Sequence, residues 1–437
     1  MKSSRLALYA AALFLYIMGA WFHFPYGGGH VYSDIVTVFQ SRFCASGPCY
    51  LGVPYVSVFV EYPILTALFM WVMGLLGSGY TLLTGSGSPL NNYYYFTCIF
   101  LAIPTFLLIR ESLKIAEMLH LRERRVLLYV IATPSFIFML LLNWYVIGVF
   151  FAVFALRKSM EGSKVFSGIL FGLSAASNLV TAAPAIGVLF MLRSWKDRLF
   201  LAAAALATYG AINLPFMIAN PTMWFRAWNY YYTWYTEGSW LILFTYPNIF
   251  SPLRHTVPFV VFGVLSLAIL AKVWKEVRAA KLLDQRAVAS EMIRIAWLFT
   301  FAYLFSTYIF TPQMNMILLP FFALAPIARR YWEFLVFDTV NSLVIVLGYS
   351  MTLPYLFGIS YVFSNAGPTT IIPMLVIIRS LWVGKFVIVD GLAFPSRLKE
   401  SENPAMLQLG ARTRLASRLR KLFHLVASAP SPRDTTG

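Results

Sequence analysis

Apolar runs of membrane length recur from one end of the chain to the other, and they restrict the fold more than any other feature. A transmembrane helix needs about 20 predominantly apolar residues. Hydrophobic residues make up 59% of the 437 residues and charged residues only 12%, whereas soluble domains carry about 25% charged residues. The sequence therefore predicts an all-α polytopic membrane protein with about 11–13 helices over residues 1–390. A basic cytoplasmic tail is expected over residues 391–437.

The formal net charge of +17 comes from basic residues that fall mostly between the apolar runs. That distribution is typical of cytoplasmic loops under the positive-inside rule. No folded basic module is visible in the sequence, so we expect no nucleic-acid partner. Lys2 and Arg5 precede the first run and orient the N-terminus inward, which places the first loop on the outer side.

The crossing pattern is ambiguous before the basic segment Arg110–Arg125, which should be cytoplasmic. The apolar stretch Ile64–Leu76 is short for a span, and a loop is expected over Gly77–Asn92. If Ile64–Leu76 crossed fully, the basic segment would lie outside. Either that helix is re-entrant, or the Gly77–Asn92 region hides another partial crossing.

The first loop, Trp21–Pro63, holds two of the chain's 17 acidic residues, Asp34 and Glu61. A carboxylate beside a membrane span is costly unless it is solvated, paired or used. A short helix is expected from Asp34, which would act either as a catalytic carboxylate or as a helix cap. Cys44 and Cys49 flank a Gly-Pro turn, so they form either a disulfide in an outward loop or two unpaired thiols.

With this topology, four polar clusters are expected to meet on the outer face and to form a cavity. One cluster is the first loop itself, and the second is Asn143 with its aromatic neighbours. The third is the loop Ala219–His255, which contains the aromatic run Trp224–Trp240, and the fourth is the turn around Gln313. The residues predicted to bind substrate are Glu61, Tyr62, Asn143, Glu237, Gln313 and Asn315.

Few basic residues are expected on the outer side, and they are candidates for binding a phosphate. Arg226, Arg254 and His255 lie in the second outer loop, and a guanidinium matches phosphate oxygens in a bidentate way. The alternative is contact with lipid headgroups. The five histidines show no metal-ligand spacing, so no cofactor is expected; a divalent metal stays open as an alternative.

Several motifs, in order along the chain, resemble glycosyltransferase family 87. Asn213–Trp240 (NLP…NP…W…GS-W) and Phe310–Leu324 (TPQMN…LP) are similar to two of its segments. Glu61–Pro63 (EYP) resembles its tyrosine-proline start of the helix after the first loop. Asp34 lies where enzymes of the GT-C superfamily keep an acidic residue. The family comprises polyprenyl-phosphate-mannose-dependent mannosyltransferases of that superfamily.

The resemblance implies a GT-C-type bundle with a long first extracytoplasmic loop and an inverting transfer of a sugar, mannose in the family. The donor would be a polyprenyl-phosphate sugar and the acceptor a lipid or glycan, in a multi-pass protein of a prokaryotic plasma membrane. Asp34 would be the general base, with Arg226, Arg254 and His255 on the donor phosphate.

The chain also departs from the family pattern. Asn178 stands at a position where the family often has lysine, and Asn143-Trp144-Tyr145 replaces an N-G-Q pattern. The region around Thr236 and Glu237 replaces an arginine. A transporter or lipid flippase, and a non-catalytic subunit of the same fold, are therefore kept as alternatives. A transporter would place its charges within the membrane helices.

Overall fold

The computed structural model describes residues 2–25, 31–44, 49, 51–192, 194–279, 285–325, 331–348 and 371–392. These residues form helices, and among them β-structure is limited to two isolated bridges. Eight of the described helices are long and apolar enough to cross a membrane, and three shorter apolar helices accompany them. The protein is therefore an all-α, multi-pass integral membrane protein. The predicted tail lies outside the described residues apart from its first two positions.

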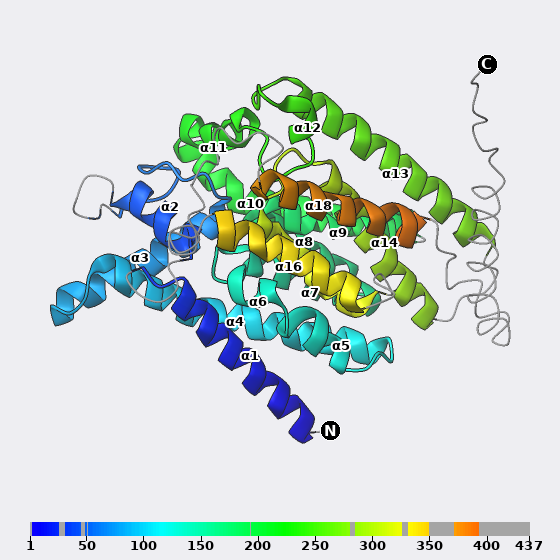
Figure 1. Cartoon of the computed structure of the whole chain (residues 1–437), viewed down its shortest axis with the longest axis horizontal. Helices are drawn as coiled ribbons and strands as arrows, with labels where there is room; N and C mark the ends of the chain where they lie inside the picture. The colour runs from blue at the N-terminus through cyan, green and yellow to red at the C-terminus, as the bar shows by residue number, and fades with distance from the viewer. Residues whose placement is uncertain are drawn as a thin grey trace, which may run out of the picture.

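The helices follow in this order along the chain: α1 (Lys2–Phe22), α2 (Asp34–Phe43), α3 (Ile64–Thr84), α4 (Pro89–Met118), α5 (Arg124–Val126), η1 (Leu127–Ile131), α6 (Pro134–Phe138), α7 (Tyr145–Met160), α8 (Lys164–Ser177), η2 (Leu179–Ala182), α9 (Pro184–Met191), α10 (Trp195–Ala219), α11 (Pro221–Thr233), α12 (Ile242–Thr245), α13 (Leu253–Ala279), α14 (Gln285–Ser306), η3 (Pro312–Ile317), α15 (Leu318–Leu324), α16 (Tyr331–Gly348), α18 (Ile371–Lys385) and η4 (Phe386–Leu392). Figure 1 shows α2 and α11 at one end of the bundle, here named the loop end, and α5 at the opposite end, named the basic end.

Helix α3 starts at the loop end and forms a hairpin with the start of α4. Near its start, the Thr66 hydroxyl donates to the carbonyl of Ser177, the last residue of α8, at 2.7 Å. Near its end, Thr81 accepts a hydrogen bond from Asn92, in the first turn of α4, at 2.8 Å. Figure 1 shows α3 running out from the bundle rather than along it. Although α3 is long enough to cross a membrane, it does not traverse this bundle.

Helix α4 then brings the basic segment to the end where the chain begins. Arg5, in the first turns of α1, donates from Nε to Glu123 Oε1 at 2.6 Å. The segment that starts at Arg110 and the N-terminus therefore share the basic end, and the positive-inside rule predicts one side of the membrane for both.

The predicted loop over Gly77–Asn92 is wrong, because α3 continues to Thr84 and α4 already begins at Pro89. Gly77 explains the tight hairpin: a Cβ there would lie 2.4 Å from the backbone nitrogen of Tyr93. Gly77, which in sequence resembled a loop signal, thus allows two apolar helices to pack closely.

The apolar run Val126–Leu142 is almost long enough for one membrane helix, but the structure divides it. A π-helical turn ends at Ile131, and α6 starts afresh at Pro134. The Thr133 hydroxyl caps α6 by accepting from the Phe136 amide at 3.1 Å. Thr-Pro is a strong helix-start pair, since proline at the first helical position loses no hydrogen bond.

Small residues allow α8 and α10 to approach closely along their length. A Cβ on Gly168 would lie 2.4 Å from the Leu201 carbonyl oxygen, and one on Gly172 would lie 2.6 Å from that of Ala205. Association of helices in lipid depends on such close packing, because lipid tails are as apolar as the side chains.

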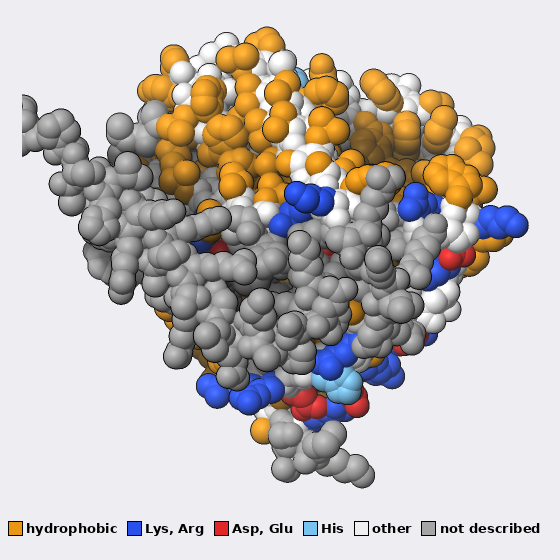
Figure 2. Space-filling model, turned by 90° about the vertical axis from the view of Figure 1, so that its right-hand side faces the viewer, with side chains coloured by type: hydrophobic (Ala, Val, Ile, Leu, Met, Phe, Trp, Pro, Cys, Tyr) orange, Lys and Arg blue, Asp and Glu red, His pale blue; other side chains and the backbone are white. Residues whose placement is uncertain are grey.

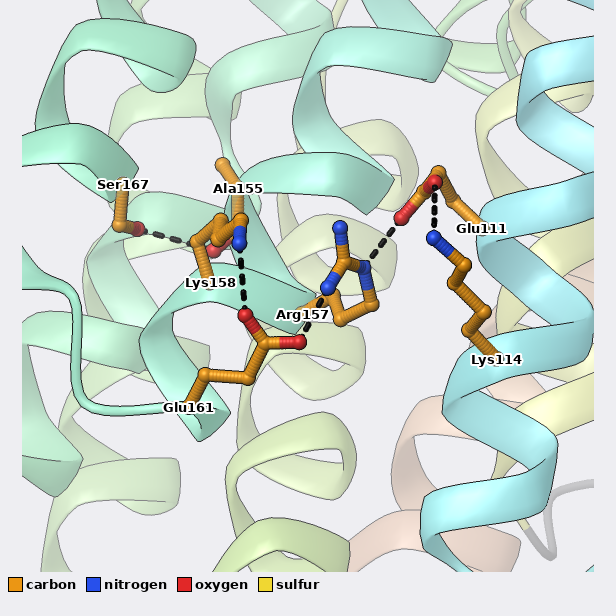
Figure 3. Close-up of polar contacts among 7 residues, drawn as sticks. All are labelled: Glu111, Lys114, Ala155, Arg157, Lys158, Glu161 and Ser167. Atoms are coloured by element: carbon orange, nitrogen blue, oxygen red, sulfur yellow. Dashed lines mark hydrogen bonds and ion pairs between the residues drawn. The ribbon is translucent and has the colours of Figure 1, made fainter.

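Ion pairs tie α4 to α7 at the basic end (Figure 3). Arg157, which is 8% exposed, pairs with Glu111, which is 3% exposed, and also with Glu161. Lys158 reaches Glu161 at 2.8 Å and Lys114 reaches Glu111 at 3.4 Å. Figure 2 shows the side of the molecule that is on the right in Figure 1. On that side, Lys and Arg side chains gather on the lower part, below a hydrophobic surface.

Candidate functional site

A pocket of about 180 Å³ opens among segments at the loop end. It brings together the end of the first loop, the turn after α8, helix α11 and the chain after α14. Its lining is dominated by tyrosines and tryptophans, with one carboxylate and two asparagines. The aromatic and polar residues that line it are Tyr55, Glu61, Tyr145, Asn178, Tyr209, Asn213, Trp224, Trp228, Tyr231, Tyr303, Thr307 and Tyr308. None of its lining residues is Lys, Arg or His.

Three acidic residues predicted from the sequence converge beside this pocket. Burial is the largest cause of the raised pKa of Tyr230 in α11. The negative charges of Glu61, Glu237 and Asp34 raise this pKa further. These carboxylates come from the end of the first loop, the second loop and the start of α2. The fold therefore gathers at one place acidic groups that lie up to about 200 residues apart in sequence.

Asp34 is held at the first turn of α2 by the chain that precedes α7. Its backbone amide donates to the Leu142 carbonyl at 2.8 Å, and the Ser33 hydroxyl donates to the Leu141 carbonyl at 2.9 Å. Its carboxylate accepts from the Tyr62 hydroxyl at 2.7 Å and from the Gln313 amide at 3.4 Å. Asp34 is only 8% exposed, so this carboxylate is buried among neutral donors.

Burial raises the pKa of Asp34 above its ordinary value, and this is the largest influence on it. Hydrogen bonds from Tyr32, Tyr62 and Asn143 oppose the rise, and the charge of Glu61 adds to it. A carboxylate with a raised pKa is a stronger proton acceptor once ionised, which suits a general base.

The capping alternative for this position does not fit the structure. The N-cap residue of α2 is Ser33, and its side chain makes no capping hydrogen bond. The Asp34 carboxylate is instead bound by Tyr62 and Gln313, which lie outside α2.

Glu61 lines the pocket, but its charge is already compensated. Arg42, in the last turn of α2, donates from Nε to Oε2 at 2.7 Å and from Nη2 to Oε1 at 3.0 Å. Two parallel charge-assisted bonds of this kind fix both partners. Glu61 therefore ties α2 to the end of the first loop, and both oxygens of its carboxylate are already bound by Arg42.

Glu237 sits on a turn that is joined to the chain after α14. Its amide donates to the Tyr308 carbonyl at 3.0 Å, and its carbonyl accepts from the Phe310 amide at 2.9 Å. Its carboxylate accepts from the Trp234 indole at 2.7 Å. The second loop is thus held against the segment that leads to Gln313.

The four predicted amide and phenol side chains divide between the site and the core. Tyr62 and Gln313 contact Asp34 directly. Asn143 is fully buried, accepts from the Tyr145 amide at 2.9 Å and lowers the pKa of Asp34. Asn315 binds Ser135 and Asp338 in the core and contacts neither Asp34 nor the pocket.

The three predicted phosphate-binding residues do not line the pocket and do not form one cluster. Arg226 is exposed and lies over the Phe59 ring at 4.5 Å. Arg254 donates to the carbonyls of Phe250 and Ser251. His255 meets Tyr308, a pocket residue, edge to face at 5.0 Å. Arg254 and His255 therefore lie behind one wall of the pocket.

A disulfide after α2 and a capping asparagine after α8 also bear on the site. The structure joins Cys44 to Cys49 by a disulfide, with their Cα atoms 4.0 Å apart, directly after α2. Asn178 lines the pocket and caps the turn η2 by accepting from the Val180 amide at 3.1 Å.

Among the described residues, no group of three or more His, Cys, Asp or Glu side chains could hold a metal ion.

The sequence did not single out Tyr32 among the groups that hydrogen-bond Asp34, nor the buried residues Asp338, Asn341 and Arg379. Tyr32 stands two positions from Asp34, within reach of its carboxylate. Asp338 and Arg379 are ionisable residues inside apolar runs, and such residues are functional candidates by default.

No model of a known protein family matches the chain, and no curated protein matches its sequence.

Proposed function

We propose that this protein is a membrane glycosyltransferase of GT-C type that transfers a sugar from a polyprenyl-phosphate donor to a lipid or glycan acceptor. The observation that carries the proposal is the buried carboxylate of Asp34, held by Tyr62 and Gln313 at a pocket-bearing end of the bundle. The family-like motifs around Glu61, Asn213 and Gln313 supply segments of that same end. Mannose as the sugar and the plasma membrane of a prokaryote are parts of the proposal that rest on the resemblance.

The chemistry of the pocket favours an uncharged sugar as its occupant. Aromatic rings such as Trp228 and Tyr231 offer apolar faces for stacking, and Asn178 and Asn213 offer amide hydrogen bonds. A pocket without cations among its lining residues is a poor place for a phosphate. The donor phosphate would instead lie towards Arg254, on the far side of Tyr308.

In the proposed reaction, an acceptor hydroxyl attacks the anomeric carbon of the donor sugar on the face opposite the phosphate. Asp34 takes the hydroxyl proton as the new C–O bond forms. The bond from the anomeric carbon to the phosphate oxygen breaks, and its electron pair leaves with polyprenyl phosphate. General-base catalysis of this kind contributes about 10²–10⁴-fold.

The test is a transfer assay in membranes with a panel of radiolabelled polyprenyl-phosphate sugars, comparing the wild type with Asp34→Asn. The amide keeps the shape of the carboxylate but does not accept the proton, so transfer should fall by about two orders of magnitude or more. Asp197→Asn is the matched control, because Asp197 lies in the first turn of α10, away from the pocket. That variant should transfer at the wild-type rate.

Protein stability separates lost chemistry from lost folding. The pKa of Asp34 is raised in the folded state, so the stability this group contributes is present at low pH and is lost as pH rises through the folded pKa. At neutral pH, Asp34→Asn should therefore melt at the same or a higher temperature than the wild type. Wild-type transfer by a well-expressed Asp34→Asn protein would reject Asp34 as the base and turn attention to Glu237.

One observation favours a second candidate, a transporter or lipid flippase. Asp338 and Arg379 are buried in apolar helices α16 and α18, as charges in transport pathways often are. A fluorescent-lipid translocation assay in proteoliposomes distinguishes the two. Translocation without transfer of any sugar in the panel would favour the flippase, and neither activity would favour a non-catalytic subunit.

A further inference from the structure

Two charged side chains are completely buried between helices of this membrane bundle. Asp338 in α16 and Arg379 in α18 each have 0% of their surface exposed. Charges at such depth are costly, and they persist where they are hydrogen-bonded and where they serve a purpose. Their partners lead directly to the two turns that carry Glu237 and Gln313.

Asp338 binds the turn that carries Gln313. Its carboxylate accepts from the Ser135 amide at 2.9 Å and from the Asn315 side chain at 2.7 Å. Asn341, one helical turn further along α16, donates to the Pro312 carbonyl at 3.0 Å. The short helix η3, which positions Gln313 against Asp34, is thus bound at two of its residues by α16.

Arg379 joins this anchor to the second turn. It donates from Nη1 to Asn341 Oδ1 at 2.8 Å and from Nη2 to the carbonyls of Gly238 and Phe310. Its guanidinium also lies over the Phe310 ring at 4.1 Å. One planar group therefore bridges α16, the residue after Glu237 and a residue shortly before Gln313.

The Glu237 turn and the Gln313 turn are in close contact where Arg379 binds. Gly238 has a φ of +60°, and a Cβ on it would lie 2.3 Å from the Phe310 carbonyl oxygen. That φ and that separation both favour glycine. The carbonyl oxygens of Gly238 and Phe310 both accept from Nη2 of Arg379, so the positive guanidinium is attracted to two groups of partial negative charge, one on each turn.

We propose that Arg379 is a positioning residue that locks the Glu237 turn and the Gln313 turn together beside Asp34. Asp338 and Asn341 hold the Gln313 turn against α16, and Asn341 also binds Arg379. The functional consequence rests on the proposed glycosyltransferase activity, whereas the mechanical one does not. Lysine cannot replace arginine in this role, because a point-like ammonium lacks the planar fork that reaches three acceptors at once.

The mechanical part is tested by hydrogen–deuterium exchange, which needs no activity. The amides of Glu237 and Phe310 form the bridge between the turns, bonding to the carbonyls of Tyr308 and Glu237. In Arg379→Met, peptides containing these two amides should exchange about tenfold faster or more, which corresponds to the loss of a charge-assisted hydrogen bond. Peptides from α8 should be unchanged.

Arg125→Met is the matched control, since Arg125 also donates to three carbonyls, at the basic end. It should leave the Glu237 and Phe310 amides as protected as in the wild type. Should Arg379→Met fail to fold, Arg379→Lys retains the charge without the fork and should show the same local loss. Unchanged exchange of both amides in a folded Arg379 variant overturns the proposal.

The functional part is tested by a double-mutant cycle with Glu237→Gln in the transfer assay. If Arg379 acts through the Glu237 turn, Arg379→Lys should lower kcat at least tenfold in the wild type and much less in the Glu237→Gln background. Equal losses in both backgrounds would refute coupling through that turn. Absence of transfer in the wild type would instead count against the glycosyltransferase proposal and would leave the exchange result standing.

Discussion

Tyr62→Phe is the sharpest test of the catalytic proposal, because it removes one hydroxyl and little else. The Tyr62 hydroxyl donates to Asp34 Oδ2 at 2.7 Å. The ring packs edge to face on Trp144, with centroids 4.9 Å apart, and phenylalanine preserves that contact. The substitution therefore changes the protonation of Asp34 rather than the shape of the pocket.

The size of the effect follows from the bond that is lost. A hydrogen bond to a charged group is worth about 1.5–3 kcal/mol, and one pKa unit corresponds to about 1.36 kcal/mol. The bond stabilises the carboxylate form, so its removal should raise the pKa of Asp34 by about one to two units. Gln313 at 3.4 Å and the Tyr32 hydroxyl remain to stabilise the charge, which favours the lower part of that range.

The measurement is kcat/KM for sugar transfer from about pH 5 to pH 9. The acid limb of the Tyr62→Phe profile should move upward by about one to two pH units, while the plateau at high pH stays close to that of the wild type. Activity lost at low pH should thus return as pH rises. Tyr209→Phe, which removes a hydroxyl from another wall of the pocket, should leave the limb in place. An unmoved limb, or a loss of equal size at every pH, would show that Asp34 is not the titrating base.

Three further predictions concern the loop end. Arg254→Ala should raise the donor KM about tenfold or more, because it removes a cation that could pair with the donor phosphate; an unchanged KM would assign Arg254 to lipid headgroups. Mass spectrometry of protein purified without reductant should show Cys44 linked to Cys49, and free thiols at both positions would contradict the disulfide. Single cysteines introduced at the exposed positions Ser57 and Arg122 should be labelled by impermeant reagents from opposite sides of the membrane, and labelling from one side would refute the crossing pattern.

The sequence by itself determined the class of fold and the chemical inventory of the site. Recurrent apolar runs leave the chain no soluble alternative, since their burial needs lipid or other helices. Acidic residues such as Asp34 and Glu237 stand out because carboxylates are scarce in a chain of this kind. Their identification needed no coordinates.

Only the tertiary structure decided how α3 lies. Its length and composition fit a crossing helix, because hydropathy is a property of the segment alone. Its actual path is fixed by contacts with α8 and α4, which include a hydrogen bond between Thr66 and Ser177, 111 residues apart. Sequence patterns report the period of a helix and carry no information about such distant partners.

The same limit explains the division between Gln313 and Asn315, which look alike in sequence. They lie two positions apart in a 3₁₀-helical turn, and three residues complete each turn of such a helix, so their side chains point in different directions. Gln313 meets Asp34 across 279 positions of sequence, whereas Asn315 meets Asp338 in the core. Which of the two meets Asp34 depends on the rotation of η3, and α16 and α18 hold η3 and the chain before it through Asn341 and Arg379.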